Sequence, residues 1–451
     1  MIKNSSEGVS VNSTNFKLIF RSLKHRNYRL FFCGQSISLV GSWMQSVAIA
    51  WLVYKITGSV LILGLVGFAS KIPILLFSSF TGVLIDRWSR HHVLIITQIL
   101  AMIQALILVL IYFAGSIEIW QIFILSITMG CINAFDIPAR HSFVIDMVEK
   151  KDMGNAIALN SLMFNGAMLI GPSIAGVLLA VEGEGICFLI NGFSYLFVII
   201  SLFMMNNIPS VPLKQRSNIF KDMKEGFKYT FGFTPIKYII LFLALVNLLA
   251  VPYTLLMPAF AKEILHGGSN TFGFLIGSSG FGALLAALYL ASGKTPLRMG
   301  NIIPWSAAIF GVGLILFSFT HFQVFSFILM IVVGFGDMLH TSASNTMIQT
   351  ITDDDKRGRV MSIYTMAIVG IAPFGSLLIG ELAKAIGIPI TIIIGGATCI
   401  IGALIFLRKL PDVKKLMRPA YINFGDFSKV TTDIQRASEH GLNTTYKLKS
   451  V

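Results

Sequence analysis

Three ionisable residues stand inside long apolar stretches of this 451-residue sequence: Lys71, Asp337 and His340. A charge at the centre of a bilayer costs roughly 3 kcal/mol on insertion scales, so such residues mark ion or substrate sites. A carboxylate with a histidine one helical turn away can take up and release a proton, and a buried lysine can bind an anionic group. Structural roles stay open, because Lys71 can extend to an interface and Asp337 and His340 can bridge helices.

A second polar feature is a seam in the apolar stretch at residues 30–57. Gln35, Ser38, Ser42 and Gln45 follow one another at spacings of three, four and three. This is the repeat of one helical face, so an otherwise apolar helix is predicted to turn polar side chains toward a cavity. A hydrogen-bonded contact between two helices is the alternative. Asn165 is predicted to join the cavity lining from another helix, together with Asn191 and Asn247.

The elements that hold these residues are predicted to be membrane-spanning helices. Charged residues make up 12% of the chain and hydrophobic residues 55%, whereas about a quarter of the residues in soluble domains are charged. A helix needs about 20 apolar residues to cross a bilayer. Continuous runs of this length, unlike the alternating strands of a membrane barrel, predict an all-α membrane protein with twelve spans, at 30–57, 60–85, 93–114, 117–137, 155–181, 186–205, 238–261, 272–292, 302–320, 322–345, 360–383 and 386–407.

The net charge of +14 is distributed by side of the membrane. We assign 31 of the 35 Lys and Arg residues to the two tails and to alternate loops; Lys55, Lys262 and Lys384 fall in the opposite loops, and Lys71 lies in a helix. This asymmetry follows the positive-inside rule. Both termini are therefore predicted to be cytoplasmic, in a multi-pass protein whose partner is the lipid bilayer and not nucleic acid.

The spans divide into two halves. We predict a cytoplasmic N-terminal tail at 1–29, a six-helix half at 30–205, a cytoplasmic linker at 206–237, a second half at 238–407 and a cytoplasmic C-terminal tail at 408–451. Within the linker, aromatic and apolar residues recur at helical spacing between charged ones, which favours either a helix on the membrane surface or a solvated linker. Six helices in each half predict two parallel repeats.

The most specific motif follows the second span. It reads Gly82-Val-Leu-Ile-Asp86-Arg87-Trp-Ser-Arg90. Four further stretches accompany it: Gly41–Gln45, Ala134–Arg140, Asn155–Asn160 and Arg357–Ser362. Together these stretches resemble the drug:proton antiporter branch of the major facilitator superfamily, which includes the enterobactin (siderophore) exporter and macrolide efflux proteins. The resemblance implies the major facilitator fold of two six-helix halves.

The resemblance also implies a cytoplasmic gate. A carboxylate at a helix N-terminus gains from the unpaired N–H groups and the helix dipole. In the superfamily the loop Asp holds the start of the eleventh helix, which here begins near Gly358, and the loop arginines pair with acids such as Asp136. The implied gating residues are Gly82, Asp86, Arg87, Arg90, Asp136, Arg140 and Arg359. Ordinary cationic anchors at the membrane surface are the alternative for the arginines.

These features predict a secondary active transporter in the bacterial cytoplasmic (inner) membrane. By the resemblance it exports small amphipathic molecules, siderophores or drugs, in exchange for protons by alternating access. It needs no cofactor beyond the proton gradient and works as a monomer. The residues predicted to couple protons or bind substrate are Asp337, His340, Lys71, Gln35, Ser42, Gln45 and Asn165.

Other functional classes are less compatible with the sequence. It contains no G-x-x-x-x-G-K-[ST], H-E-x-x-H or G-x-S-x-G motif, which argues against an ATP-driven pump and against a membrane enzyme. Its four cysteines lie in separate apolar runs, so no metal site is predicted. The remaining alternatives are a lysophospholipid flippase and a non-transporting membrane receptor or scaffold of the same fold.

Overall fold

The spanning helices form two bundles. The computed structural model describes residues 20–85, 88–206, 219–291, 299–353 and 356–411. Within these residues twelve helices are long and apolar enough to cross a membrane, which confirms the predicted all-α, twelve-span fold. The first bundle consists of α2 (Arg26–Thr57), α3 (Val60–Ile85), α4 (Arg90–Phe113), α5 (Ile119–Asp146), α6 (Met153–Val181) and α7 (Glu184–Phe203).

The second bundle contains two interrupted spans. Its seventh span is built from α9 (Thr234–Leu249), α10 (Tyr253–Ala259) and the π-helical turn η3 (Phe260–Ile264), and its eleventh from α14 (Arg357–Thr365), the π-helical turn η5 (Met366–Gly370) and α15 (Ala372–Ile386). Prolines stand at the breaks because proline cannot continue a hydrogen-bonded helix: Pro252 precedes α10, and Pro373 lies in the first turn of α15. The other four spans are α11 (Ser269–Ala291), α12 (Met299–Ser318), α13 (Gln323–Ile351) and the final helix Ile388–Pro411.

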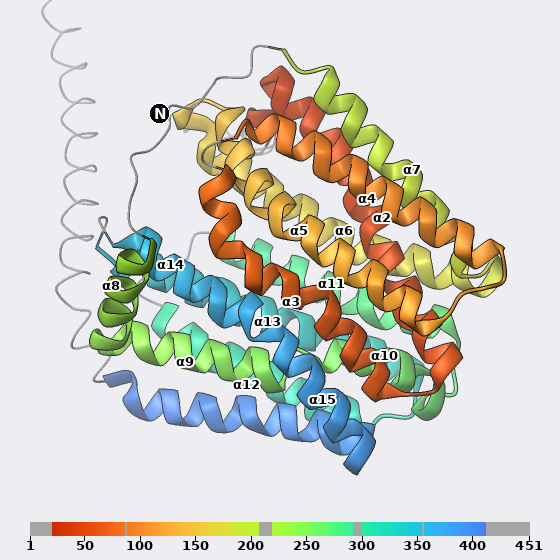
Figure 1. Cartoon of the computed structure of the whole chain (residues 1–451). Coiled ribbons are helices and arrows are strands. Elements are labelled where there is room, and N and C mark those ends of the chain that lie inside the picture. The colour runs from red at the N-terminus through yellow and green to blue at the C-terminus, as the bar shows by residue number, and fades with distance from the viewer. Residues whose placement is uncertain (1–19, 86–87, 207–218, 292–298, 354–355, 412–451) are drawn as a thin grey trace, which may run out of the picture.

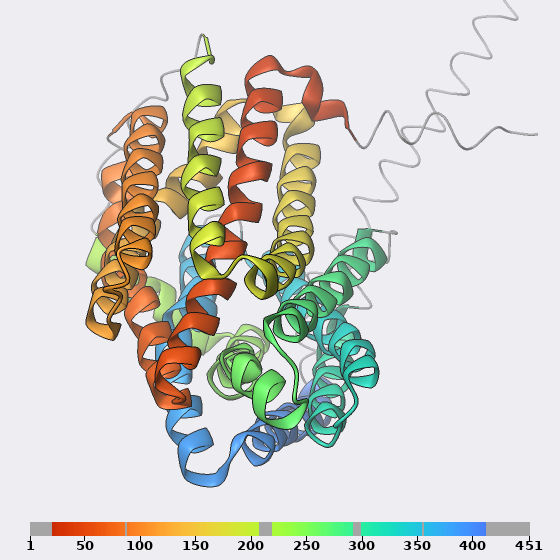
Figure 2. The ribbon, with the colours of Figure 1, turned by 90° about the vertical axis from the view of Figure 1, so that its right-hand side faces the viewer.

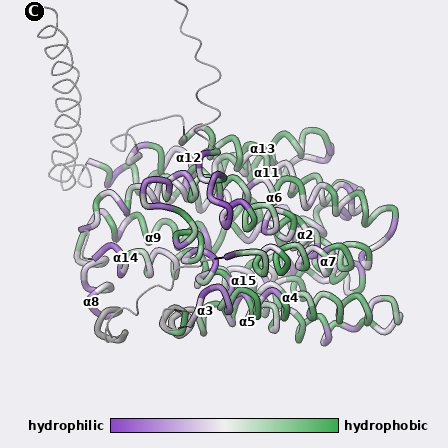
Figure 3. The backbone as a smooth tube through the Cα atoms, turned by 90° about the horizontal axis from the view of Figure 1, so that it is seen from above, coloured by the Kyte–Doolittle hydropathy of each residue, from purple (hydrophilic) through white to green (hydrophobic). Residues whose placement is uncertain are grey.

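The twelve spans define two sides of the molecule. We call the side where α2 and α4 begin and α5 ends the tail side, and the side where α2 ends and α3 begins the far side. An even number of spans brings the last helix back to the tail side. Figure 1 shows α8 and α14 at the left of the view and the red start of α2 at the top, and Figure 3 shows apolar residues along most of the spanning helices.

The two halves meet along two helix pairs. One pair joins α6 to α11, and the other joins α3 to α15. Figure 2 shows the halves as separately coloured bundles, with the blue α15 beside the orange-red α3. Each pair takes one helix from each half, so any change in the angle between the halves must rearrange both pairs.

The linker contains a helix that belongs to the second half. Helix α8 (Ile219–Gly232) packs on α14. Arg359 donates a hydrogen bond from Nη1 to Glu225 Oε2 at 2.7 Å, and Tyr229 donates to Asp353 at 3.1 Å. The rings of Phe227 and Phe231 stack at 5.8 Å and remain exposed. An exposed aromatic pair on a charged helix is the arrangement expected of a helix on the membrane surface, which is one of the two alternatives for the linker.

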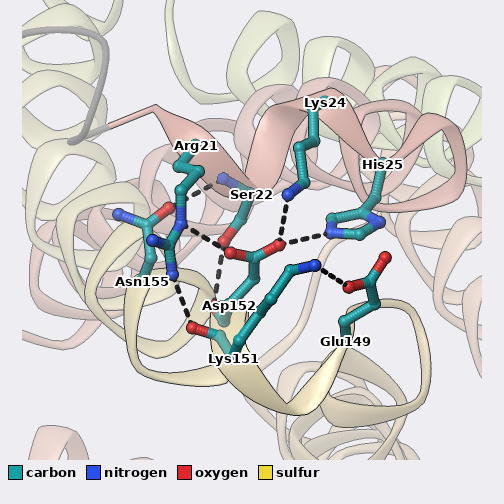
Figure 4. A network of polar contacts seen from close by, with 8 residues as sticks. All are labelled: Arg21, Ser22, Lys24, His25, Glu149, Lys151, Asp152 and Asn155. Carbon is teal, nitrogen blue, oxygen red and sulfur yellow. Dashed lines mark hydrogen bonds and ion pairs between the residues drawn. The ribbon is translucent and has the colours of Figure 1, made fainter. Parts of the chain in front are cut away.

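A charge cluster fixes the start of α2 to the connection between α5 and α6. Asp152, in the 3-10 turn η2 (Lys150–Asp152), binds three side chains of the segment that precedes α2. Its carboxylate lies 2.5 Å from Arg21 Nε, 2.7 Å from Lys24 Nζ and 2.8 Å from His25 Nε2 (Figure 4). These partners cover the Asp152 side chain completely. The first helix is therefore held by the carboxylate of a loop 130 positions away in sequence.

Hydrogen bonds to backbone atoms reinforce this cluster. The low pKa of the Asp152 carboxyl keeps the cluster intact in mild acid. Ser22 N donates to Asn155 Oδ1 at 2.8 Å, and Ser22 Oγ donates to the Asp152 carbonyl at 3.0 Å. The hydrogen bonds from Lys24 and His25 hold the pKa of the Asp152 carboxyl well below its usual range. A carboxyl with a lowered pKa stabilises the fold above its unfolded pKa, and that contribution is lost only as the pH falls through the folded pKa. The cluster is therefore complete at neutral pH and breaks only in strong acid.

Replacing Asp152 by Asn is expected to release the segment before α2. The substitution keeps the size of the side chain but removes the charge that Arg21 and Lys24 bind. Tryptic cleavage after these two residues should become several-fold faster at neutral pH, measured on the full chain in detergent. Glu149→Gln is the matched control, because the Glu149–Lys151 pair of the same loop is exposed. Equal cleavage of the Asp152→Asn variant and the wild type would show that the cluster does not hold the segment.

Candidate functional site

A cavity of about 530 Å³ lies in the first half and is lined by residues of α2, α3, α4, α5, α6 and α7. Its wall includes the predicted polar face of α2, since Gln35, Ser38, Ser42 and Gln45 all line it. From the second half the lining includes Leu255. The polar spacing in α2 therefore does face a cavity.

Hydrogen bonds join this polar face to neighbouring helices as well. Gln45 donates from Nε2 to Gln104 Oε1 at 3.2 Å and accepts from Asn191 Nδ2 at 2.8 Å. Ser42 Oγ lies 3.3 Å from Tyr195 Oη. The two interpretations of the seam both hold, because the same side chains bridge α2 to α4 and α7 while they form the cavity wall. These amides are pre-positioned by one another, which makes the wall rigid.

Asp136 and Arg140 of α5 line the cavity. Asp136 is almost fully buried and accepts hydrogen bonds from Thr97 Oγ1 at 2.9 Å and Gln98 Nε2 at 2.8 Å. Arg140 Nη2 lies 3.4 Å from the same carboxylate, one helical turn along. The expected pairing of Asp136 with Arg90 is therefore wrong, because Asp136 lies roughly 15 Å along the helix from the end of α5 at Asp146.

The loop arginine uses a different acid. Arg90 donates from Nη1 to both carboxylate oxygens of Asp146, at 2.8 and 2.7 Å. Both residues stand at tail-side helix ends, which explains why they meet. Gly82 lies near the end of α3, Arg359 in the first turn of α14 is held by Glu225, and Asp86 and Arg87 lie outside the described residues.

Lys71 lines the same cavity from the middle of α3. Its side chain is half-buried, and among the described residues no carboxylate lies within 4 Å of its Nζ atom. The structure thus places Lys71 at a cavity wall in the membrane interior. A lysine at this depth is costly to insert into a membrane, which indicates that Lys71 has a functional role.

Asp337 and His340 occupy separate environments in α13. His340 is fully buried, its Nδ1 lies 3.1 Å from the Ile303 carbonyl of α12, and its ring packs edge-on to Phe242 at 4.9 Å. Asp337 is half-buried, and within the described chain no cation lies within 4 Å of its carboxylate. The expected Asp337–His340 pair is therefore wrong, because His340 makes its hydrogen bond with the Ile303 carbonyl of α12.

Asn165 also departs from expectation. Its Nδ2 donates to the Ser161 carbonyl of its own helix at 2.8 Å. Asparagine often bonds the preceding turn in this way, which satisfies the amide without a cavity partner. The amides that do line the cavity include Gln98, Gln104 and Asn191. The sequence prediction did not include Gln98 and Gln104. Both are uncharged polar residues in the apolar run at 93–114, and this was the signal that could have identified them.

The halves contact each other tightly toward the far side. A Cβ atom added to Gly273 of α11 would lie 2.4 Å from the Pro172 carbonyl oxygen and 2.5 Å from Gly176 Cα, both in α6. Only glycine allows two helix backbones to come this close. A Cβ on Gly64 of α3 would likewise lie 2.6 Å from the Ser376 carbonyl oxygen of α15. Both inter-half pairs are thus closed in the part of the membrane nearer the far side.

Polar and aromatic contacts add to this closure. Tyr54 at the end of α2 donates a hydrogen bond to Glu263 of the second half, and Lys262 lies 5.7 Å from the centre of the Tyr54 ring. Trp51 and Phe272 stack across the halves at 6.2 Å. The cavity borders this layer at Ala50 and Leu63 and extends from there toward the tail side, where its wall reaches Arg140, roughly two turns from the tail-side end of α5.

Comparison with known proteins supports the same picture. The sequence matches the family described as transmembrane secretion effector over residues 19–434. It is 28% identical over 388 residues to a staphyloferrin A transporter of Staphylococcus aureus, covering 84% of this chain and 95% of that one. It is 22% identical over 405 residues to macrolide efflux protein A of Streptococcus pyogenes, covering 87% and 99%. In fold it is similar to a bacterial homologue of the human lysosomal transporter Spinster, solved inward-facing and unoccupied, with a TM-score of 0.62, 13% identity and coverage of 88% of this chain and 98% of that one.

Proposed function

Because this chain belongs to the transmembrane secretion effector family of major facilitator transporters, we propose that it is a secondary active exporter of small amphipathic molecules, siderophores or drugs. One observation carries the proposal: a polar-walled cavity inside the membrane extends from a closed contact layer toward the tail side. A transporter that loads substrate from one side needs this arrangement. The name of one relative, a macrolide efflux protein, supports export, and the name of another, a staphyloferrin A transporter, supports a siderophore as the substrate.

Alternating access would proceed by exchange of the inter-half contacts. Opening toward the far side requires separation of α6 from α11 and of α3 from α15 where their backbones touch. It also requires loss of the Tyr54–Glu263 hydrogen bond. Closure on the tail side would bring the α3–α4 loop toward α14, and Asp86 is proposed to act there.

Proton coupling is proposed to depend on Asp337. It is a carboxylate at the middle of a spanning helix, and the described chain provides no cation within ion-pair distance. Without a cation nearby, the ionised form of this carboxyl is costly inside the membrane and protonation removes that cost, which favours loading of a proton. The proton gradient would then drive export.

The tail side is proposed to be cytoplasmic, in a bacterial inner membrane. Support comes from the distribution of Lys and Arg, and the exceptions Lys55 and Lys262 have local roles: Lys55 pairs with Glu184 at 3.0 Å, and Lys262 lies over the Tyr54 ring. In a variant without the four native cysteines, Glu182→Cys should react with a membrane-impermeant thiol reagent on intact cells, and Lys228→Cys on α8 should not. The opposite pattern would invert the orientation.

The experiment that tests export uses everted membrane vesicles, in which the tail side would face the medium. Vesicles that contain the chain should accumulate a radiolabelled macrolide or a siderophore when an inside-acid gradient is imposed, at least tenfold above vesicles from empty-vector cells. A protonophore should abolish the accumulation. If neither the macrolide nor the siderophore accumulates in response to the gradient, the chain is not a proton-driven exporter of these compounds.

A further inference from the structure

We propose that the cavity selects an organic anion with a single carboxylate head group, and that Lys71 is the residue that binds this head group. The inference rests on the proposed transport function, since it names the class of substrate for the same cavity. Lys71, Asp136 and Gln98 carry the inference, and each contributes a separate requirement on the ligand.

The charges of the cavity wall come first. The described lining contains two cations, Lys71 and Arg140, and one acid, Asp136, so the net charge is two minus one, or +1. The acid is already satisfied, because it accepts from Thr97 and Gln98 and pairs with Arg140. Lys71 has no carboxylate within 4 Å among the described residues. The charge left to be balanced therefore lies at Lys71.

The size of that charge limits the ligand. A single uncompensated cation inside the membrane is best balanced by one negative charge, because any excess of either sign must be desolvated without a partner. A carboxylate carries one charge, whereas a phosphate monoester carries about −1.5 to −2 at neutral pH. A cationic ligand would face both Lys71 and Arg140 without a free acid. A monocarboxylate head group is the best match.

Gln98 adds a requirement on the rest of the ligand. Its side chain is almost fully buried, its Nε2 donates to Asp136, and its Oε1 accepts no hydrogen bond within the described structure. A buried acceptor without a donor is costly. The side chain lines the cavity although its Oε1 atom is covered, so a ligand N–H or O–H group supplies that donor once the Gln98 amide turns toward the cavity.

The apolar part of the wall completes the description. Trp43 and Phe164 line the cavity and pack edge-to-face at 5.9 Å. Such a pair offers a rigid surface for a ring or chain of the ligand. The ligand class is therefore an amphipathic carboxylate that also carries an N–H or O–H donor.

The test measures binding to the full chain in lipid nanodiscs, with three fluorescent probes that share one body. Dansylglycine carries a carboxylate and a sulfonamide N–H, its methylamide is neutral, and dansyl-ethylenediamine is a cation. The wild type is expected to bind the carboxylate at least tenfold more tightly than either of the others. Lys71→Met should reduce this preference to threefold or less, and Lys71→Arg should keep it. Lys384→Met is the control, because it removes the same charge from an exposed position on α15.

Several results would overturn the proposal. They are absence of saturable binding of the carboxylate at millimolar concentration, binding of the neutral or cationic probe as tight as that of the carboxylate, and an unchanged preference in Lys71→Met. The ranking of the three probes on the wild type decides the matter even if Lys71→Met does not fold. Binding needs no gradient, so a chain that ranks the carboxylate first but accumulates no macrolide or siderophore in everted vesicles would refute proton-driven export of those compounds while keeping the anion site.

Discussion

Asp337→Asn is expected to abolish gradient-driven accumulation in vesicles, with a loss of at least tenfold, while exchange of substrate down its own gradient continues. The amide keeps the shape of the side chain but cannot take up or release a proton. Substrate can therefore still bind and cross, although the pH gradient no longer biases the direction. Reconstituted proteoliposomes allow both modes to be measured on one preparation, with and without an imposed pH gradient.

Two further variants make this result interpretable. Glu381→Gln applies the same chemical change to an exposed carboxylate of α15 and should leave uphill transport intact. Asp337→Glu keeps a titratable group and should retain part of the uphill activity, with an altered pH profile. If Asp337→Asn still concentrates substrate in response to the gradient, Asp337 is a structural residue and another group carries the proton.

Gly273→Ala is expected to hold the transporter open toward the far side. The added methyl group would lie 2.4 Å from the Pro172 carbonyl oxygen, closer than real side chains come to backbone, so α11 and α6 must separate. Overpacking of this kind costs about 1–3 kcal/mol, and each 1.4 kcal/mol changes a population about tenfold. A cysteine introduced at Ser46, in the cavity wall, should therefore react with an impermeant thiol reagent added outside intact cells at least fivefold faster than in the parent.

The control lies in the partner helix. Gly166→Ala adds the same methyl group to α6 at a position where nothing stands within 4 Å, so cavity accessibility and transport should stay at parental levels. Transport by Gly273→Ala should fall, because the cycle requires the closed layer to re-form. Parental accessibility in Gly273→Ala would mean that this contact is not part of the far-side closure.

The sequence was most informative where a pattern repeats along one helix. Continuous apolar runs predicted the spans, and the spacing of Gln35, Ser42 and Gln45 predicted a polar helical face that the cavity confirms. Lys71 could be singled out because an ionisable residue far inside an apolar run has few structural explanations. Each of these inferences needs only local periodicity, which sequence records directly.

Contacts between distant segments could not be predicted in this way. Tyr54 and Glu263 meet across 209 positions, and Asp152 meets residues of the N-terminal segment across roughly 130. Nothing in their local spacing indicates either contact. His340 shows the complementary error: its separation of three residues from Asp337 suggested a pair, but the carbonyl of Ile303 on another helix takes its hydrogen bond. Depth in the membrane was also misjudged for Asp136, which stands inside a helix rather than at its end.

The Asp152 cluster has a consequence for biosynthesis. Its members lie in the segment before α2 and between Glu149 and Asn155, so the contacts can form as soon as α6 begins to emerge from the ribosome. None of them depends on the second half, which at that moment has not been translated. The start of α2, the first span, is thus bound to the loop that follows α5, the fourth span, before the remaining spans enter the membrane. Sequential insertion then adds the second half to a partly locked first half, in keeping with the tendency of nascent domains to fold in chain order.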